Sequence, residues 1–263
     1  MSVFIDSLVD ILVFLYKLTL WFIKMVAKML LLIFRSDFVR GGEVKSPHIG
    51  KRKPHKHRNA KMPFGWGNQG SSPSAPQVDT STWSLPLLRA FEWKRYEEVV
   101  AHYYSALGYT SKVTRMGADG GVDVVLYQQG NPQPAIIVQC KAWSKNVGVK
   151  AVRELFGVMA ADGIGYGIFA TTSDYTKEAY DFAQGRPMEL MSGQGFMEKV
   201  RALTTEQQQW LLERATEGDF TTPTCPNCNV KMTSRESKKG ANAGSRFWGC
   251  PTYPKCRQTF KID

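Results

Sequence analysis

The sequence has few cysteines and a shortage of acidic residues, and each shortage excludes a class of protein. Only five cysteines occur among 263 residues, and four of them form two close pairs near the C-terminus. An odd total with metal-ligand spacing argues against a secreted disulfide framework and indicates a reducing compartment. Asp and Glu number 23 against 34 Lys and Arg, so the net charge is +11. That excess favours a polyanionic partner, either nucleic acid or an anionic membrane face.

Residues 3–34 are nearly all apolar, yet the features of a secretory signal are missing. No basic segment precedes the apolar run, and no small-residue cleavage site follows it. Its length suits a transmembrane helix, but its charged residues fall on one narrow helical stripe. The helix either spans the membrane and pairs this stripe with another copy, or lies in the interface with the stripe facing water. The stripe consists of Asp6, Asp10, Lys17, Lys24 and Lys28.

Residues 35–82 have the composition of a flexible basic linker. Between residues 35 and 68, nine Lys or Arg stand against two acidic residues, which accounts for +7 of the net charge. Residues 65–82 are rich in Gly, Ser and Pro. A basic flank beside an apolar helix marks the cytoplasmic side of a membrane. We therefore expect an anchor in the bacterial inner membrane, with the rest of the chain facing the cytoplasm.

An ordered domain is predicted over residues 85–217. Apolar residues recur at helical spacing in some segments, and short β-prone runs lie between them. The order of these segments predicts an α/β domain with a mixed central sheet. The predicted elements are a helix over 86–107 that stops at Gly108, strands over 109–114, 122–127 and 135–140, a helix over 148–161, a buried strand over 166–172, a helix over 174–184 and further helical structure over 186–217.

Polar residues stand at the ends of two of these predicted strands. Asp123 opens the second strand, while Gln139 and Lys141 lie two residues apart near the end of the third and therefore share a face. Cys140 between them points the other way and is expected in the core. Phosphodiester hydrolysis requires a metal that offsets phosphate charge and activates water, and Mg²⁺ prefers oxygen ligands. If the two strands are hairpin neighbours, this pattern predicts such a site.

Residues around these strands extend the candidate site. Glu97 on the preceding helix would supply a further carboxylate, with Glu98 as its competitor for that role. Gly120 and Gly121 would let the backbone or DNA approach closely. Taken singly, the polar residues also have ordinary explanations, because turns commonly use Asp and solvated faces commonly carry Glu, Gln and Lys.

Three stretches together resemble the Mrr-like branch of the PD-(D/E)XK nucleases over about residues 90–185. They are "YEEVVAHYYSALGYTSKVTRMGADGGVDVVLY", "IIVQCKAWSKNVGVKAVRELFGVMAADG" and "GIFATTSDYTKEAYDFA". The resemblance implies a restriction-endonuclease-like core of αβββαβ order. It also implies that Asp123 binds Mg²⁺, that Gln139 adds a weaker oxygen ligand, and that Lys141 positions water or stabilises the transition state. Glu97 matches the helix carboxylate of the family's first motif.

The four C-terminal cysteines form a second motif, within residues 222–263. A CxxC pair is followed by 21 residues, a third cysteine, five residues and a fourth. Two such pairs suit tetrahedral structural Zn²⁺, and so short a segment needs a metal to fold; free thiols are the alternative. "CPNC" with "RFWGCPTYPKC" resembles the C-terminal zinc-ribbon repeats of type I bacterial topoisomerases. The predicted zinc ligands are Cys225, Cys228, Cys250 and Cys256.

The topoisomerase repeats bind single-stranded DNA, so the resemblance implies a nucleic-acid surface on this module. Aromatic residues would stack on bases while basic residues meet phosphates. Alternatively the aromatics form the small core of the ribbon, and we expect Trp248 to be partly core. Asn229 replaces the usual glycine after the second cysteine and still tolerates a left-handed turn. The candidate DNA-contacting residues are Arg235, Lys238, Lys239, Arg246, Phe247, Trp248, Tyr253 and Lys255.

These features together predict a membrane-anchored, Mg²⁺-dependent DNA endonuclease that acts in restriction or defence against foreign DNA. One alternative is a membrane-bound DNA tether or regulator without turnover, although the presence of Asp123 and Lys141 argues against a degenerate site. Another is a repair or recombination nuclease that acts on single-stranded or branched DNA. Because one site per chain has to cut two strands, a homodimer is favoured.

Overall fold

The computed structural model describes residues 78–114, 121–238 and 243–262. The predicted membrane helix over residues 3–34 and most of the predicted linker lie outside these ranges. In the described ranges no helix combines the length and the apolar character that a membrane crossing requires. All described residues belong to the unit Arg52–Asp263.

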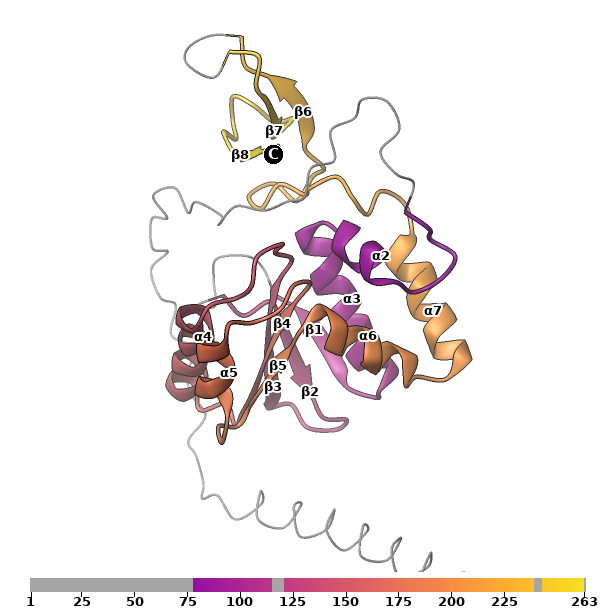
Figure 1. Ribbon diagram of the computed structural model, residues 1–263, viewed down its shortest axis with the longest axis vertical. Helices are drawn as coiled ribbons and strands as arrows, with labels where there is room; N and C mark the ends of the chain where they lie inside the picture. Colours follow the sequence, from indigo (N-terminus) through magenta and orange to yellow (C-terminus); the bar gives the residue numbers. More distant parts are fainter. Residues whose placement is uncertain (1–77, 115–120, 239–242, 263) are drawn as a thin grey trace, which may run out of the picture. The chain divides into compact units, whose positions relative to one another are not determined.

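A five-stranded sheet forms the centre of the larger described domain (Figure 1). The spatial order is β1-β2-β3-β4-β5, in which the first two pairings are antiparallel and the last two are parallel. This arrangement confirms the mixed central sheet predicted from the sequence. The strands are β1 (Thr110–Val113), β2 (Val124–Tyr127), β3 (Pro134–Lys141), β4 (Tyr166–Thr171) and β5 (Met188–Met191).

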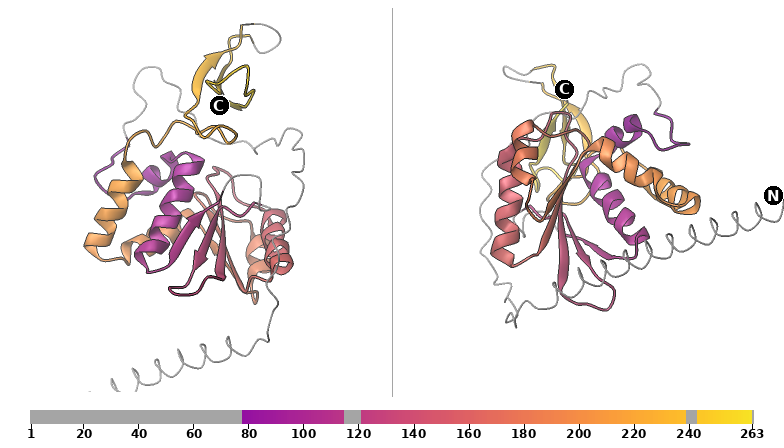
Figure 2. Two further views of the ribbon diagram at one scale, coloured as in Figure 1. Left: turned by 180° about the vertical axis from the view of Figure 1, so that it is seen from behind. Right: turned by 60° about the horizontal axis from the view of Figure 1, so that its bottom comes forward.

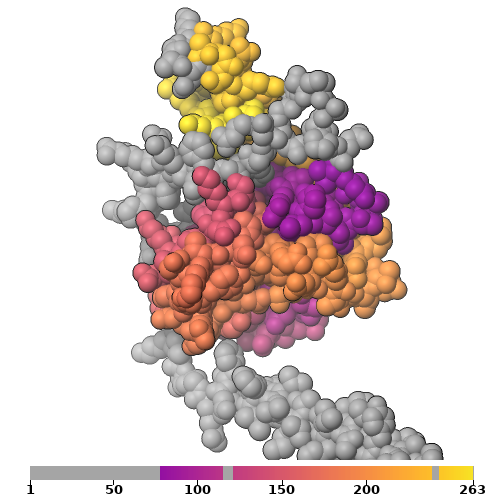
Figure 3. All heavy atoms as spheres, viewed as in Figure 1, coloured from indigo at the N-terminus to yellow at the C-terminus, as the bar shows by residue number. Residues whose placement is uncertain are grey.

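Helices cover both faces of this sheet (Figure 2). Helices α4 (Val149–Asp162) and α5 (Lys177–Ala183) lie on one face. The other face carries α3 (Trp93–Ala106), α6 (Gly193–Arg201) and α7 (Thr205–Thr216). The short helix α2 (Leu85–Ala90) contacts α6 on that side, where both are visible at the surface (Figure 3). Each helical layer encloses its own buried apolar cluster against the sheet.

The helix predicted over residues 86–107 is in fact two helices. Phe91 and Glu92 have extended backbones, with ψ angles of 130° and 158°, so α2 ends before this pair and α3 begins after it. Phe91 is completely buried, and the Glu92 side chain caps α3 by accepting a hydrogen bond from the Lys94 amide. A capping residue satisfies amides at a helix start, which makes the interruption stable. The predicted stop is confirmed, because Gly108 follows α3 with a φ of +90°.

Residues 186–217 were predicted to be helical, and this is wrong for the first part. Met188–Met191 forms β5, which pairs in parallel with β4 at the end of the sheet. The strand has four residues and no alternation of polar and apolar side chains, so its sequence carries no strand periodicity. Its pairing with β4 defines it. The later part of the segment contains α6 and α7, as predicted.

The C-terminal segment forms a separate three-stranded antiparallel sheet of order β6-β7-β8. Its strands are β6 (Thr233–Glu236), β7 (Arg246–Gly249) and β8 (Thr259–Lys261). Its small core contains three buried cysteines and Met232, with Cys228, Trp248 and Phe260 packed against it. The expectation that Trp248 is partly core is therefore confirmed.

Candidate active site and metal centre

Asp123 stands at the start of β2, directly beside the end of β3. The two strands are antiparallel neighbours with Val124 opposite Val138, so the register places Asp123 opposite Gln139. The Asp123 amide donates to the Val138 carbonyl at 2.9 Å, and the Asp123 Oδ2 accepts from the Cys140 amide at 2.7 Å. The carboxylate is thus held on both its backbone and its side chain by β3.

Lys141 places a positive charge beside this carboxylate. Its ammonium nitrogen lies 3.5 Å from Asp123 Oδ2, and its side chain keeps about a quarter of its surface exposed (25%). Burial raises the pKa of Asp123, while Lys141 and the Cys140 amide act in the opposite direction. Cys140 is buried in the core beneath α3, whereas Ile137 belongs to the core on the α4 side. This alternation confirms that Cys140 faces away from Gln139 and Lys141.

Glu97 brings a second carboxyl group to the same place from α3. It is buried (7% exposed), and its carboxyl shares a hydrogen bond with Asp123. Burial raises the pKa of Glu97 to about 10, with the charge of Asp123 adding to the rise and Lys141 opposing it. Glu98 points elsewhere and forms ion pairs with Lys94 and Arg95. Of the two adjacent glutamates, only Glu97 lies at the site.

Gln139 lies on β3 opposite Asp123, and a glycine makes room for its side chain. Gln139 is buried (8% exposed). Gly121 has a φ of +96°, and a Cβ on it would stand 2.8 Å from the Gln139 Nε2. A residue with a side chain would therefore be strained here and would also displace Gln139. Gly120, its predicted companion, lies outside the described residues.

Sequence reasoning missed three consecutive hydroxyls that hold the chain after Lys141. Thr171 donates to the Lys141 carbonyl at 2.8 Å, Thr172 to the Trp143 carbonyl at 3.1 Å, and Ser173 to the Lys145 carbonyl at 2.8 Å. All three are buried at the end of β4. The sequence does contain a clue to them in "ATTSDY" at 170–175. Hydroxyl side chains at the end of a buried strand need hydrogen-bond partners.

The donor set at this end of the sheet fits a hard divalent cation. Asp123 and Glu97 are buried carboxyl groups in mutual contact, and the Gln139 side chain includes an amide oxygen. Magnesium takes oxygen ligands, commonly one or two carboxylates completed by water and phosphate. A buried acidic pair whose pKa values are raised by burial is the electrostatic situation that a cation relieves.

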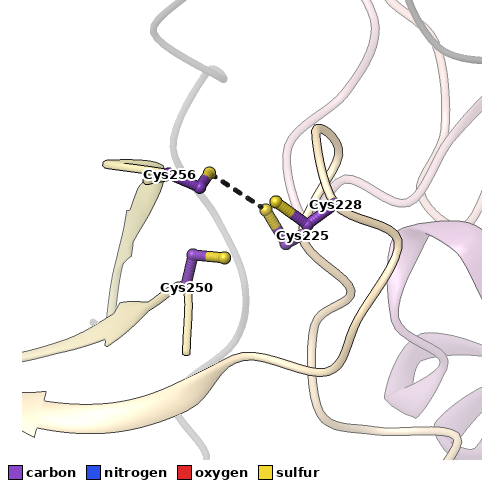
Figure 4. Close-up of side chains that lie close together, drawn as sticks. All are labelled: Cys225, Cys228, Cys250 and Cys256. Carbon is purple, nitrogen blue, oxygen red and sulfur yellow. Dashed lines mark hydrogen bonds between the residues drawn. The ribbon is translucent and has the colours of Figure 1, made fainter. Parts of the chain in front are cut away.

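The four C-terminal cysteines converge on one point (Figure 4). Their sulfur atoms all lie within 4.8 Å of one another, with Cys225 and Cys256 3.7 Å apart. Sulfur atoms about 2.3 Å from a tetrahedral Zn²⁺ would be separated by about 3.8 Å, so the cluster fits zinc.

Two further residues support this cluster from outside. The Thr252 hydroxyl lies 3.0 Å from the Cys250 sulfur and 3.3 Å from the Cys228 sulfur. Hydrogen bonds from such neighbours orient thiolate ligands. Asn229 has a φ of +56°, which confirms the left-handed turn expected after the second cysteine.

The predicted DNA-contacting residues of the ribbon are mostly at its surface. Tyr253 is 59% exposed, and Phe247 and Trp248 are half-buried. The Arg246 guanidinium donates to the Ser234 hydroxyl at 3.0 Å. Lys239 lies outside the described residues. The exposed basic residues of the set are Arg235, Lys238, Arg246 and Lys255.

Comparison with known proteins assigns both domains. Residues 88–200 match the Mrr catalytic family model, described as a restriction endonuclease. Residues 222–263 match the model of the topoisomerase DNA binding C4 zinc finger.

Two curated proteins are similar to part of this chain. The type IV methyl-directed restriction enzyme EcoKMrr of Escherichia coli (strain K12) is 33% identical over 106 residues, which are 38% of this chain and 35% of that protein. The uncharacterized protein y4cE of Sinorhizobium fredii (strain NBRC 101917 / NGR234) is 32% identical over 93 residues, 34% of this chain and 24% of that protein. The matches therefore span about a third or less of the relatives' own lengths.

Two solved structures are also similar, at low identity. The MspJI restriction endonuclease in complex with a 27-mer oligonucleotide has a TM-score of 0.34 and 19% identity, covering 51% of this chain and 34% of that one. The DNA modification-dependent restriction endonuclease AspBHI has a TM-score of 0.37 and 21% identity, covering 55% and 44%. Both TM-scores are below 0.5, so the assignment rests on the family models. Residues 88–200 therefore form a restriction endonuclease domain of the Mrr catalytic family, and residues 222–263 form a C4 zinc ribbon of the topoisomerase type.

Proposed function

We propose that this protein is a Mg²⁺-dependent DNA endonuclease that hydrolyses phosphodiester bonds in restriction of foreign DNA. One observation carries the proposal: Asp123, Glu97 and Lys141 come from three different elements and meet at one end of the sheet, with Lys141 3.5 Å from Asp123. Two carboxyl groups and a cation in one polar site suit phosphate chemistry. The restriction role is supported by the identity to EcoKMrr in the matched segment.

Each residue of the site has a role that follows from its placement. A bound Mg²⁺ would offset phosphate charge and favour deprotonation of water. Asp123 and Glu97 would hold that cation, with Gln139 as a weaker oxygen ligand. Lys141 is partly exposed and already paired with Asp123, so its ammonium group can orient the attacking water and stabilise the charge that develops on phosphate. Held at its carbonyl by Thr171, Lys141 keeps a defined direction.

We assign a supporting role to the ribbon, with zinc held by the four cysteines and DNA held by its exposed surface. The convergence of the thiols supports the metal, and the exposed Tyr253 with nearby basic residues supports the DNA. Stacking on aromatic side chains is tolerant of sequence, so this module would strengthen binding without selecting a site.

We further propose that residues 3–34 anchor the protein to the inner membrane, with the nuclease in the cytoplasm. Support comes from the length of the apolar run and from the basic residues that follow it. Fractionation of cells that express the full chain, or a chain without residues 1–40, tests the anchor. Loss of membrane association on truncation is expected, and unchanged protection against phage after truncation would argue against a role for the anchor in defence.

The decisive experiment compares the full-length wild type with Lys141→Ala in mild detergent. Each is incubated with methylated, unmethylated and single-stranded DNA, with Mg²⁺ or with a chelator. We expect the wild type to cut only with the metal and Lys141→Ala to bind without cutting. Preference for methylated duplex would support restriction, whereas preference for single strands would support repair. Binding by both proteins without cleavage, even with Mn²⁺, would instead indicate a DNA tether.

Cross-linking of the protein during cleavage tests the homodimer that the sequence favours.

A further inference from the structure

The start of α3 contacts the ribbon through a buried carboxylate. Glu92 is only 2% exposed. It accepts hydrogen bonds from the Thr224 amide at 3.1 Å, the Thr224 hydroxyl at 2.8 Å and the Lys231 ammonium at 3.1 Å. Its fourth donor, the Lys94 amide at 3.2 Å, belongs to α3 itself. A buried carboxylate is stable only when it is paired and hydrogen-bonded, and here the ribbon supplies most of the donors.

Neighbouring residues of α3 extend this contact. The Trp93 indole donates to the Thr224 carbonyl at 3.0 Å, and the Lys94 ammonium donates to the Asn229 side chain. Polar contacts that include charged groups are stronger than neutral ones and depend on well-defined geometry. We call this contact the knuckle joint; it consists of Glu92, Trp93 and Lys94 on α3 with Thr224, Asn229 and Lys231 on the ribbon.

The ribbon side of the joint is built directly on two of the clustered cysteines. Thr224 precedes Cys225, and Asn229 follows Cys228. The turn between them is closed by hydrogen bonds from the Asn229 amide to the Cys225 carbonyl and from the Cys225 amide to the Val230 carbonyl, both at 2.8 Å. A metal on the two thiols would hold this turn closed, because ligand geometry and local folding are linked. Loss of the metal would therefore loosen the ribbon side of the joint.

The other side of the joint leads to the candidate active site. Glu97 lies five residues after Glu92 on the same helix, which is about 7.5 Å along the helix axis. Between them, Arg95 donates to the carbonyl of Arg214 at 2.6 Å, within the last turn of α7, and to the carbonyl of Glu217 at 2.8 Å, just beyond its end. Besides its local contacts, the first turn of α3 is thus held by residues that follow it by more than 100 positions. Its position decides where Glu97 stands relative to Asp123.

We propose that the knuckle joint couples metal occupancy of the four cysteines to the placement of Glu97, with Glu92 as the positioning residue. The ribbon then supports the nuclease domain in addition to binding DNA. Only the consequence at Glu97 rests on the proposed function; the coupling itself is a property of the fold. Linkage is reciprocal, so a change that breaks the joint weakens metal binding by the factor by which the metal stabilises the joint.

The first test measures hydrogen–deuterium exchange in the full-length wild type, kept in mild detergent, with zinc bound and after removal by a chelator. Removal of zinc is expected to speed exchange of the amides of Tyr96–Val100 about tenfold, a typical coupling between two sites. The amides of α4 serve as the internal reference and are expected to stay unchanged. Faster exchange in the ribbon with no change in α3 would overturn the proposal.

The second test uses Glu92→Gln, with Glu154→Gln on the exposed side of α4 as the matched control. Zinc affinity is measured by competition with a chromogenic chelator. Glu92→Gln keeps an acceptor at the helix cap but loses the charge, so we expect zinc affinity about tenfold weaker. The control should match the wild type. A variant that merely loosened the whole domain would also speed exchange in α4, which separates positioning from general destabilisation.

A third variant keeps the proposal testable if Glu92→Gln fails to fold. Thr224→Val removes one donor to Glu92 from the ribbon side and leaves α3 unaltered. It is expected to weaken zinc binding and to speed exchange in α3 in the same direction. Wild-type zinc affinity in both variants would overturn the coupling. If no variant, and not even the wild type, cuts DNA, the nuclease proposal fails while exchange and zinc affinity still decide the coupling.

Discussion

The Cys140 amide donates a 2.7 Å hydrogen bond to Asp123 Oδ2, the same oxygen that lies 3.5 Å from the Lys141 ammonium. Because Cys140 stands between Gln139 and Lys141, this one bond sets the carboxylate relative to both neighbours on β3. The candidate site is therefore built by the pairing of β2 with β3. Five changes test what this geometry and the four cysteines contribute.

Asp123→Asn should strongly reduce cleavage while the fold is kept. The amide oxygen of Asn can still accept from the Cys140 amide, but the charge that would bind the cation is gone. We expect cleavage to fall by about 10³-fold, a size known for single catalytic residues. Plasmid cleavage rates and thermal unfolding measure the two effects. Asp162→Asn, an exposed change at the end of α4, is the control, and equal rates in both variants would contradict the role of Asp123.

Glu97→Gln should stabilise the metal-free protein at high pH. The folded-state pKa of Glu97 is raised from its ordinary 4.5 to about 10 by burial. The contribution of this carboxyl to stability is therefore fully present below pH 4.5 and is lost as the pH rises toward about 10. A neutral amide avoids this loss. The free energy of unfolding of the variant should therefore exceed that of the wild type by on the order of 2 kcal/mol at pH 8. Urea unfolding at pH 5 and pH 8, with a chelator present, measures the difference; an equal effect at both values would contradict the raised pKa.

Gly121→Ala should disturb the site more than an equivalent change elsewhere. At Gly121 the added Cβ meets the strain of a φ of +96° and also the Gln139 side chain at 2.8 Å. Gly130→Ala is the matched control, since its φ is +77° and nothing lies within 4 Å. Each change should cost about 1 kcal/mol of backbone strain, but only Gly121→Ala should cost more and lower cleavage. Equal losses of thermal stability in the two variants would show that the Gln139 side chain moves aside without cost.

Thr171→Val tests the buried hydroxyls. The substitution keeps the shape but removes the donor to the Lys141 carbonyl at 2.8 Å. We expect a loss of about 1–2 kcal/mol in stability, together with about tenfold slower cleavage, because Lys141 loses one of its restraints. Thr216→Val removes a comparable hydroxyl–carbonyl bond on α7 and should affect stability alone. Wild-type cleavage by Thr171→Val would show that the strand pairing suffices to direct Lys141.

Cys228→Ser should reduce zinc binding, whereas Cys140→Ala should not. Cys228 belongs to the four converging sulfurs, while Cys140 is a buried core residue of the sheet. Metal analysis of the purified protein should give one zinc per chain for Cys140→Ala and for the wild type. For Cys228→Ser we expect a substoichiometric value and a ribbon that unfolds at lower temperature. A full zinc content in Cys228→Ser would remove this cysteine from the ligand set.

Some features were predictable because they depend on local pattern. The order of helices and strands, the stop at Gly108 and the left-handed turn at Asn229 follow from periodicity and backbone preference. Other features were not, because they depend on a partner far along the chain. β5 exists as a strand through its pairing with β4, and the break at Glu92 is stabilised by Thr224 and Lys231.

The sequence alone determined the residue types of the candidate site and the four clustered cysteines, since chemistry and spacing are local properties. Only the tertiary structure decided which groups meet. Adjacent glutamates on a helix point about 100° apart, so the packing of α3 against the sheet selected Glu97 and left Glu98 with Lys94 and Arg95. The same packing buried Glu92 against the ribbon. Contacts between distant segments form only when the chain folds, and no spacing in the sequence encodes them by itself.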